Sequence, residues 1–152
     1  MCGIFGIINQ EFSRKKAEKA LNLMEHRGPN NTSYYSDDSM FLGHKRLSII
    51  DLDKRSNQPL VKENLVIIFN GEIYNYHALV DALDCEITTE SDCEVILHLY
   101  ARFGIRQTLR MIDGEFAFVI ADFRDMNAPV IHACRDPFGV RPMYIINGKH
   151  IT

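Results

Sequence analysis

The sequence predicts an α+β fold, a sandwich of two mainly antiparallel sheets with helices covering the outer faces. Strand-like segments lie at both ends of the chain and helical segments lie between them, and hairpin-type connections replace regular βαβ units. Near-continuous apolar runs such as Leu65–Phe69 indicate strands buried on both faces, so each sheet needs cover on both sides. The 152 residues fit one domain, and we expect a single domain over residues 1–152.

The first half of the chain predicts several strands and one helix. Ser13 can cap a helix that runs to about Glu25, because apolar residues recur there at helical spacing. Gly28-Pro29 then ends the helix in a loop. The strands are predicted over Cys2–Ile8, Met40–Gly43, Leu47–Asp51 and Leu65–Asn70.

The second half predicts two helices followed by strands. Asn75 or Tyr76 opens a short helix, and Ser91 with Glu94 has the spacing of a capping box ahead of a longer one. The longer helix is expected to end near Gly104, with a short helical piece after it. The strands are predicted over Gly114–Asp122, Val130–Arg135 and Met143–Ile146, and Asn147-Gly148 predicts a hairpin turn into a last strand.

Composition excludes several classes of protein. Hydrophobic residues make up 46% and charged residues 24%, as in globular domains. A net charge of −3 without a dense basic run argues against a nucleic-acid partner. The apolar runs fall short of the roughly 18 residues that a membrane helix needs, and the N-terminus lacks a signal-peptide pattern. We therefore expect a cytoplasmic protein that does not bind membranes.

Metal and nucleotide cofactors are not predicted. The four cysteines form no CxxC pair, which argues against a structural zinc site. His26 and His44 have no second ligand at a recognisable spacing, so structural or loop-supporting roles are favoured for both. The chain has neither a P-loop nor a GxGxxG motif.

Cys2 is a candidate nucleophile because of its position. If Met1 is removed, a thiol and a free α-amine lie on one residue, which then holds both a nucleophile and a base. Gly3 leaves room for a substrate to approach the backbone. The alternative is an ordinary free thiol, as expected for Cys85, Cys93 and Cys134.

Two further groups suit acyl chemistry on an amino acid. The Asn70 amide and the Gly71 backbone N–H could form an oxyanion hole, although an Asn-Gly pair can also be a plain turn. Arg46 suits a carboxylate, and Asp92 could accept from an ammonium group. Taken separately, each of these charged residues could equally be a surface ion or a helix cap.

Eight segments, in order along nearly the whole chain, resemble the class II glutamine amidotransferase domain in its asparagine synthetase version. This domain is the glutaminase with an N-terminal nucleophile (Ntn) and a four-layer αββα fold. The matching segments are Cys2–Gly6, His26–Pro29, Gly43–Asp51, Gln58-Pro59, Asn70–Asn75, Ser91–Ile96, Asp113–Phe118 and Arg135–Pro142.

The resemblance implies a role for each site residue. Cys2 would attack the side-chain amide of L-glutamine, and Asn70 with Gly71 would hold the oxyanion. Arg46 would bind the α-carboxylate beside the backbone of Leu47, Ser48, Ile49 and Ile50, while Asp92 with Glu72 would take the α-ammonium. Ammonia would leave, and water would hydrolyse the thioester to glutamate without a metal or another cofactor.

The resemblance also implies a partner. We find no Ser-Gly-Gly-x-Asp-Ser loop of a synthetase domain, so ATP and magnesium would act only in a synthetase domain or subunit outside this sequence. The family's domain usually continues past the point where Thr152 stands, so we expect a sandwich that is short at its C-terminal end. An open edge there would favour a homo-oligomer. The alternatives are an amidotransferase with another acceptor and a truncated, non-catalytic domain that binds glutamine or a partner.

Overall fold

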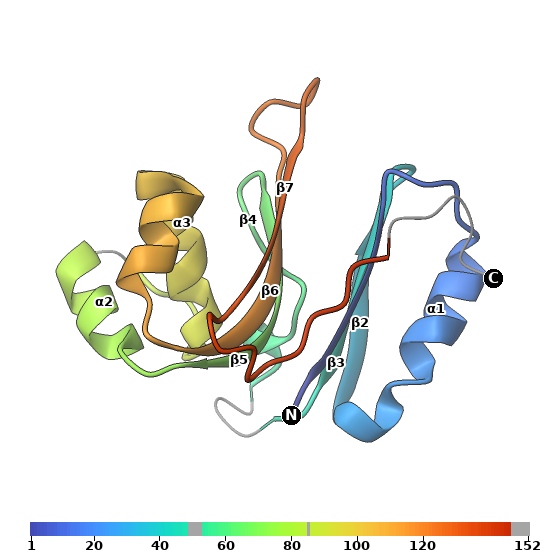
Figure 1. Cartoon of the computed structure of the whole chain (residues 1–152), viewed down its shortest axis with the longest axis horizontal. Coiled ribbons are helices and arrows are strands. Elements are labelled where there is room, and N and C mark those ends of the chain that lie inside the picture. The colour runs from blue at the N-terminus through green and yellow to red at the C-terminus, as the bar shows by residue number, and fades with distance from the viewer. Residues whose placement is uncertain (49–52, 85, 147–152) are drawn as a thin grey trace.

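The computed structural model describes residues 1–48, 53–84 and 86–146, and it confirms the predicted α+β sandwich. Figure 1 shows four layers, with α1 on one outer face and α2 and α3 on the other. One sheet has the strand order β1-β3-β2, and the second has the order β4-β5-β6-β7; all the pairs are antiparallel. The strands are β1 (Gly3–Ile8), β2 (Asn31–Ser36), β3 (Met40–Arg46), β4 (Leu60–Lys62), β5 (Leu65–Ile73), β6 (Gly114–Asp122) and β7 (Val130–Arg135).

The helices begin close to the residues that the sequence predicts. The α-helices are α1 (Arg14–Asn22), α2 (Tyr76–Leu83) and α3 (Asp92–Met111), with short 3₁₀ turns over Glu25–Arg27 and Lys54–Ser56. Asn75 precedes α2, and the Ser91 hydroxyl accepts from the Cys93 N–H at the start of α3. The capping box is only half formed, because the Glu94 carboxylate binds Thr88 and Thr89 instead of the Ser91 N–H.

Gly104 interrupts α3 as predicted. Its φ of 73° lies in the left-handed region that glycine tolerates, so two helical pieces meet there at a kink. The second piece runs to Met111, which matches the short helical segment expected after Gly104.

Several strand predictions need correction, among them the predicted Leu65–Asn70 strand, which continues to Ile73. The predicted Met40–Gly43 strand extends to Arg46, and two strands, β2 and β4, were not predicted. The predicted strand over Met143–Ile146 is wrong, because these residues are irregular and Tyr144 is 89% exposed. Leu47 and Ser48 are irregular as well, so a strand does not begin at Leu47. The rest of that prediction, residues 49–51, and the predicted turn at Asn147-Gly148 lie outside the described residues.

Strand alternation divides the core into layers. One cluster fills the space between the second sheet and the helices α2 and α3, and a smaller one joins α1 to the outer face of β3 through Phe41 and Leu21. Between the sheets, Met40 and Leu42 of β3 meet Val66 and Ile68 of β5. The next inward positions on the same strands are polar, and that end of the layer is the candidate site.

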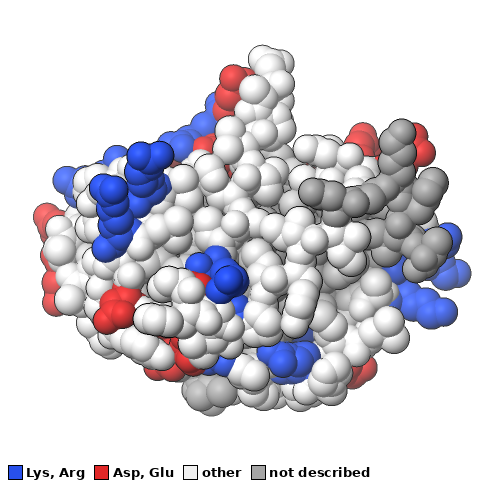
Figure 2. All heavy atoms as spheres, in the orientation of Figure 1, with Lys and Arg blue, Asp and Glu red and all other residues white. Residues whose placement is uncertain are grey.

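The surface agrees with the nearly balanced charge of the sequence. On the face shown in Figure 2, basic and acidic side chains lie in small separate groups on a mostly uncharged surface, and one basic group lies near the middle of the view. Within the described residues, the helices are too short or too polar to cross a membrane.

Candidate active site

Cys2 lies just before β1, where the backbone of Leu47 meets its thiol. The Leu47 N–H donates to Cys2 Sγ at 3.5 Å, and Sγ lies 3.8 Å from the Leu47 carbonyl oxygen. Arg27 holds the Cys2 backbone, because its Nε and Nη2 each donate to the Cys2 carbonyl at 3.4 Å.

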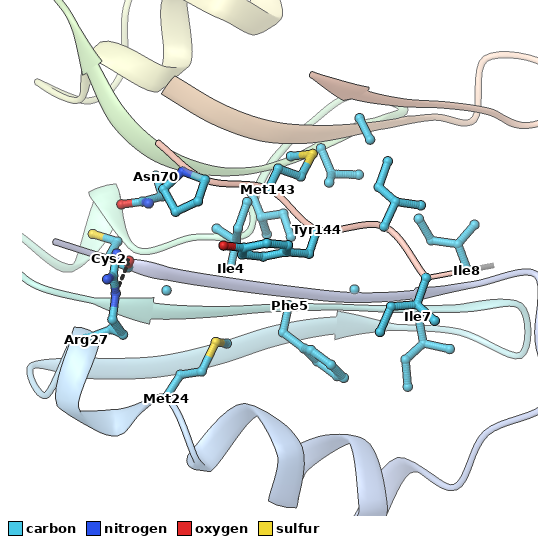
Figure 3. A pocket seen from close by; sticks show the side chains of 18 of the residues that line it. Cys2, Ile4, Phe5, Ile7, Ile8, Met24, Arg27, Asn70, Met143 and Tyr144 are labelled. Atoms are coloured by element: carbon cyan, nitrogen blue, oxygen red, sulfur yellow. Dashed lines mark hydrogen bonds between the residues drawn. The ribbon is translucent and has the colours of Figure 1, made fainter. Parts of the chain in front are cut away.

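Asn70 reaches the same space from the opposite sheet. It follows Ile68 on the inward face of β5, and it is buried. Gly71 comes next, where β6 approaches so closely that a Cβ atom would lie 2.2 Å from the Glu115 carbonyl oxygen. Figure 3 shows Cys2 and Asn70 at the same end of a cavity between the sheets.

Arg46 is the last residue of β3, and its guanidinium is held by the loop that contains Asp53 and Asn57. Its Nη1 donates to the Asp53 carbonyl at 2.8 Å and to Asn57 Oδ1 at 2.7 Å. The side chain is buried, so its positive charge is fixed in the wall of the site. A fixed guanidinium suits a small carboxylate ligand.

Asp92 is the first residue of α3 and provides a buried carboxylate. Its Oδ2 accepts from the Ile73 N–H at 2.7 Å. Burial raises the pKa of Asp92 to about 6; the bond from Ile73 opposes this rise, and the charge of Glu72 adds to it. The carboxylate is therefore ionised at neutral pH but close to titrating.

These residues open on one cavity of about 150 Å³. Cys2, Arg46 and Leu47 come from the first sheet and its following loop, and Asp92 comes from α3. The cavity is lined by Met1, Cys2, His44, Arg46, Leu47, Ser56, Gln58, Phe69, Asn70, Gly71, Glu72, Ser91, Asp92 and Arg141. The structure therefore brings together seven of the residues predicted for the site: Cys2, Arg46, Leu47, Asn70, Gly71, Glu72 and Asp92.

Among the described residues, Ser48 is the predicted site residue that does not line this cavity. The Ser48 N–H donates to Asn30 Oδ1 at 3.0 Å, which ties that loop to the segment after the first 3₁₀ turn. Ile49 and Ile50 lie outside the described residues.

Comparison with known proteins gives the family. A family model described as a glutamine amidotransferase domain matches residues 1–152. The chain belongs to the glutamine amidotransferase domain family. It is 38% identical over 152 residues to asparagine synthetase [glutamine-hydrolyzing] 3 of Arabidopsis thaliana, covering 95% of this chain and 25% of the relative. It is 41% identical over 155 residues to a probable asparagine synthetase of Dictyostelium discoideum, covering 95% of this chain and 27% of that relative.

A bacterial relative agrees with these two. Asparagine synthetase [glutamine-hydrolyzing] 1 of Bacillus subtilis is 38% identical over 155 residues, covering 95% of this chain and 24% of the relative. The chain thus spans about a quarter of the length of these curated relatives. The resemblance to class II amidotransferase domains of the asparagine synthetase type is confirmed.

Seven residues that line the cavity of about 150 Å³ were not predicted as site residues: Met1, His44, Ser56, Gln58, Phe69, Ser91 and Arg141. Gln58 Oε1 accepts from the Phe69 N–H at 2.6 Å, and His44 Nε2 donates to the Phe69 carbonyl at 3.1 Å. These two side chains hydrogen-bond to the Phe69 N–H and carbonyl groups, which lie on β5 beyond the residues that pair with β4. His44 therefore has the structural role that the sequence favoured. The sequence signal that could have placed His44 in the site was its position two residues after Leu42, on the same face of β3. Ser56, in a 3₁₀ turn, and Ser91, the N-cap of α3, also line the cavity; the sequence predicted the cap but not its place in the site.

Arg141 lines the cavity and forms an ion pair with Glu115 of β6. Asp136 anchors the loop before it, since its carboxylate accepts from the N–H groups of Val140 and Arg141, both at 3.0 Å. The sequence does not show the place of Arg141 in the site, because that place depends on the contact between this loop and Glu115 of β6.

A second, larger cavity begins at the same two residues. It has a volume of about 680 Å³ and shares Cys2 and Asn70 with the smaller one. Figure 3 shows that it runs along β1, from Cys2 at one end toward Ile7 and Ile8 at the other. In the described part of the chain, no three His, Cys, Asp or Glu side chains gather as a metal site would require.

Proposed function

We propose that this domain hydrolyses L-glutamine to L-glutamate and ammonia with Cys2 as the N-terminal nucleophile. The observation that carries the proposal is that the Cys2 thiol, next to the first sheet, and the Asn70 amide, on the second sheet, both line the cavity of about 150 Å³. Figure 3 shows these two side chains close together at one end of the larger cavity. Arg46 and Asp92 border the smaller cavity with opposite charges. That combination suits a zwitterionic amino acid with a side-chain amide.

The proposed reaction begins once Met1 is removed. The α-amine of Cys2 takes the thiol proton, and Sγ attacks the side-chain carbonyl carbon of glutamine. The resulting oxyanion accepts from the Asn70 amide and the Gly71 N–H. The tetrahedral intermediate collapses with transfer of the proton to the leaving nitrogen, so ammonia departs and a γ-glutamyl thioester remains. Water then hydrolyses the thioester to glutamate and frees the thiol.

Substrate binding uses the charges around the nucleophile. Arg46 binds the α-carboxylate, with the backbone of Leu47, Ser48, Ile49 and Ile50 beside it. Asp92 and Glu72 bind the α-ammonium. The glutaminase reaction uses no cofactor in this scheme, because its nucleophile, base and oxyanion donors all come from the chain.

We further propose that residues 1–152 form one amidotransferase domain that supplies ammonia to an asparagine synthetase acceptor site. Relatives of about four times the length support this context. The acceptor site would lie on a synthetase domain or subunit, which would use ATP and magnesium. Proposed with it are a cytoplasmic location and self-association into a homo-oligomer.

Glutamate release from glutamine by the purified chain tests the proposed activity. Cys2→Ser is expected to lower the rate by at least about 10³-fold, because the nucleophile is lost. Cys134→Ser is the matched control, since this half-buried thiol on β7 lies outside both cavities, and it should keep full activity. Equal activity of the Cys2→Ser variant and the parent would overturn the proposal. Glutamine binding without any turnover would favour the non-catalytic alternative.

A further inference from the structure

Glu94 is a buried carboxylate that lies near the site but does not line its cavity. Its side chain is 1% exposed, in the first turn of α3, two residues after Asp92. Oε2 accepts from the Thr89 N–H at 2.7 Å and from the Thr89 hydroxyl at 2.8 Å. Oε1 accepts from the Thr88 hydroxyl at 2.9 Å, and the Thr88 N–H lies 3.1 Å from both oxygens.

A second set of contacts joins Glu94 to Lys62 of β4 and, through Lys62, to His98 of α3. Lys62 of β4 donates to Oε1 at 3.1 Å. Lys62 Nζ also donates to His98 Nε2 at 2.9 Å, which requires His98 to be neutral. Burial alone would raise the pKa of Glu94, but the bonds from Thr88, Thr89 and Lys62 outweigh it and lower the pKa to about 2.

The threonine bonds set the path of the chain into Asp92. Thr88 and Thr89 belong to an irregular segment between α2 and α3, where no strand or helix satisfies their N–H groups. The Thr89 hydroxyl also accepts from the Ser91 N–H at 3.2 Å, so the support continues to the residue before Asp92. Without the carboxylate, the donors on both threonines would lose their partner; Thr89 is buried, so the segment would have to rearrange to satisfy its N–H and hydroxyl groups.

We propose that Glu94 is a positioning residue that holds Asp92 in place for the α-ammonium group of the substrate. This inference rests on the proposed glutaminase function. Glu94 acts through Thr88, Thr89 and Ser91, and it touches neither the substrate nor the reacting atoms. The Lys62 contact joins β4 to α3, whereas the threonine contacts join Glu94 to the segment before Asp92. Separate substitutions can therefore test the two sets of contacts.

The test is a double-mutant cycle on KM and kcat for glutamine. Glu94→Gln keeps the size of the side chain but turns one oxygen into an N–H donor, so it should raise KM by about tenfold with kcat changed less than about twofold. In an Asp92→Asn background, Glu94→Gln should raise KM no further, because Glu94 acts through Asp92. Lys62→Met removes the contact between β4 and Glu94, and it should leave KM and kcat near the parent values.

Other outcomes would overturn the inference. An equal rise in KM from Glu94→Gln with and without Asp92→Asn would show that Glu94 does not act through Asp92. If Glu94→Gln does not fold, Thr89→Val removes one of its bonds, and a KM rise that disappears in the Asp92→Asn background is still expected. An active parent enzyme with an additive cycle would reject the role of Glu94 and leave the proposed glutaminase function intact.

Discussion

The two ends of the layer between the sheets are built on the same strands but carry opposite kinds of side chain. At one end, Met40 and Leu42 of β3 pack against Val66 and Ile68 of β5. At the other end, the same alternation continues with polar residues, His44 and Arg46 on β3 and Asn70 and Glu72 on β5. The apolar end can bury its surface at no electrostatic cost, whereas the polar end needs partners for each buried group.

This contrast suggests a division between stability and chemistry. Side chains at the apolar end should affect folding without affecting turnover. Side chains at the polar end should affect turnover and contribute little to folding, or even oppose it. Asp92 is an example of the cost, because its buried carboxylate has a raised pKa.

Among the substitutions that test this division, Asn70→Ala should have the largest effect on turnover. Loss of an oxyanion donor should lower kcat for glutamine hydrolysis by roughly 10²–10³-fold with little change in KM. Among the described residues, the Asn70 side chain has no hydrogen bond that the substitution would break, so the thermal midpoint should stay near that of the parent. An Asn70→Ala variant with unchanged kcat would remove Asn70 from the oxyanion hole.

Leu42→Ala makes the matching change at the apolar end. Leu42 is fully buried between the sheets, so the substitution should lower the free energy of unfolding by about 2–5 kcal/mol. Denaturant unfolding gives this value, and kcat and KM measured well below the unfolding midpoint should match the parent. A selective loss of kcat in folded Leu42→Ala protein would break the proposed division.

At the polar end, a change of pH should alter KM for glutamine by less than Asn70→Ala alters kcat. Asp92 has a pKa of about 6, so protonation below pH 6 should remove its charge and raise KM by roughly tenfold per pH unit. The raised pKa means that the folded state holds the proton more tightly than the unfolded state. Stability should therefore fall as the pH rises from about 4 to about 6.

Asp92→Asn checks both consequences. The variant should have a higher KM that no longer changes around pH 6, and it should be more stable than the parent at pH 8. If KM of the parent stays flat between pH 5 and pH 8, Asp92 does not bind the ammonium through its charge.

Local sequence signals predicted much of this fold. Ser91 and Asn75 marked two helix starts, and Gly104 marked the kink, because each depends on a few neighbouring residues. The strand β2 was missed because Asn31–Ser36 is polar, and it forms by pairing with β3 and stacking Tyr34 on Phe41 at 4.8 Å. Tertiary pairing of this kind leaves no trace in a single segment.

The site shows the same limit. Cys2, Asn70 and Asp92 could be predicted because each lies in a motif, and the structure places all three on one cavity. Gln58 could not be predicted as a site residue, since its role depends on β4 ending before Phe69 and leaving that backbone N–H for the side chain. A role that depends on where a neighbouring strand stops can be recognised only in the folded structure.

Covalent labelling with a diazoketone analogue of glutamine tests the central claim, that processed Cys2 is the nucleophile. Intact mass would first separate chains that keep Met1 from chains that begin at Cys2, and peptide mapping would then locate the label. The account predicts one label per chain, on Cys2 and only in chains that have lost Met1. Labelling of Cys93 or Cys134 instead, or equally fast labelling of chains that keep Met1, would contradict it.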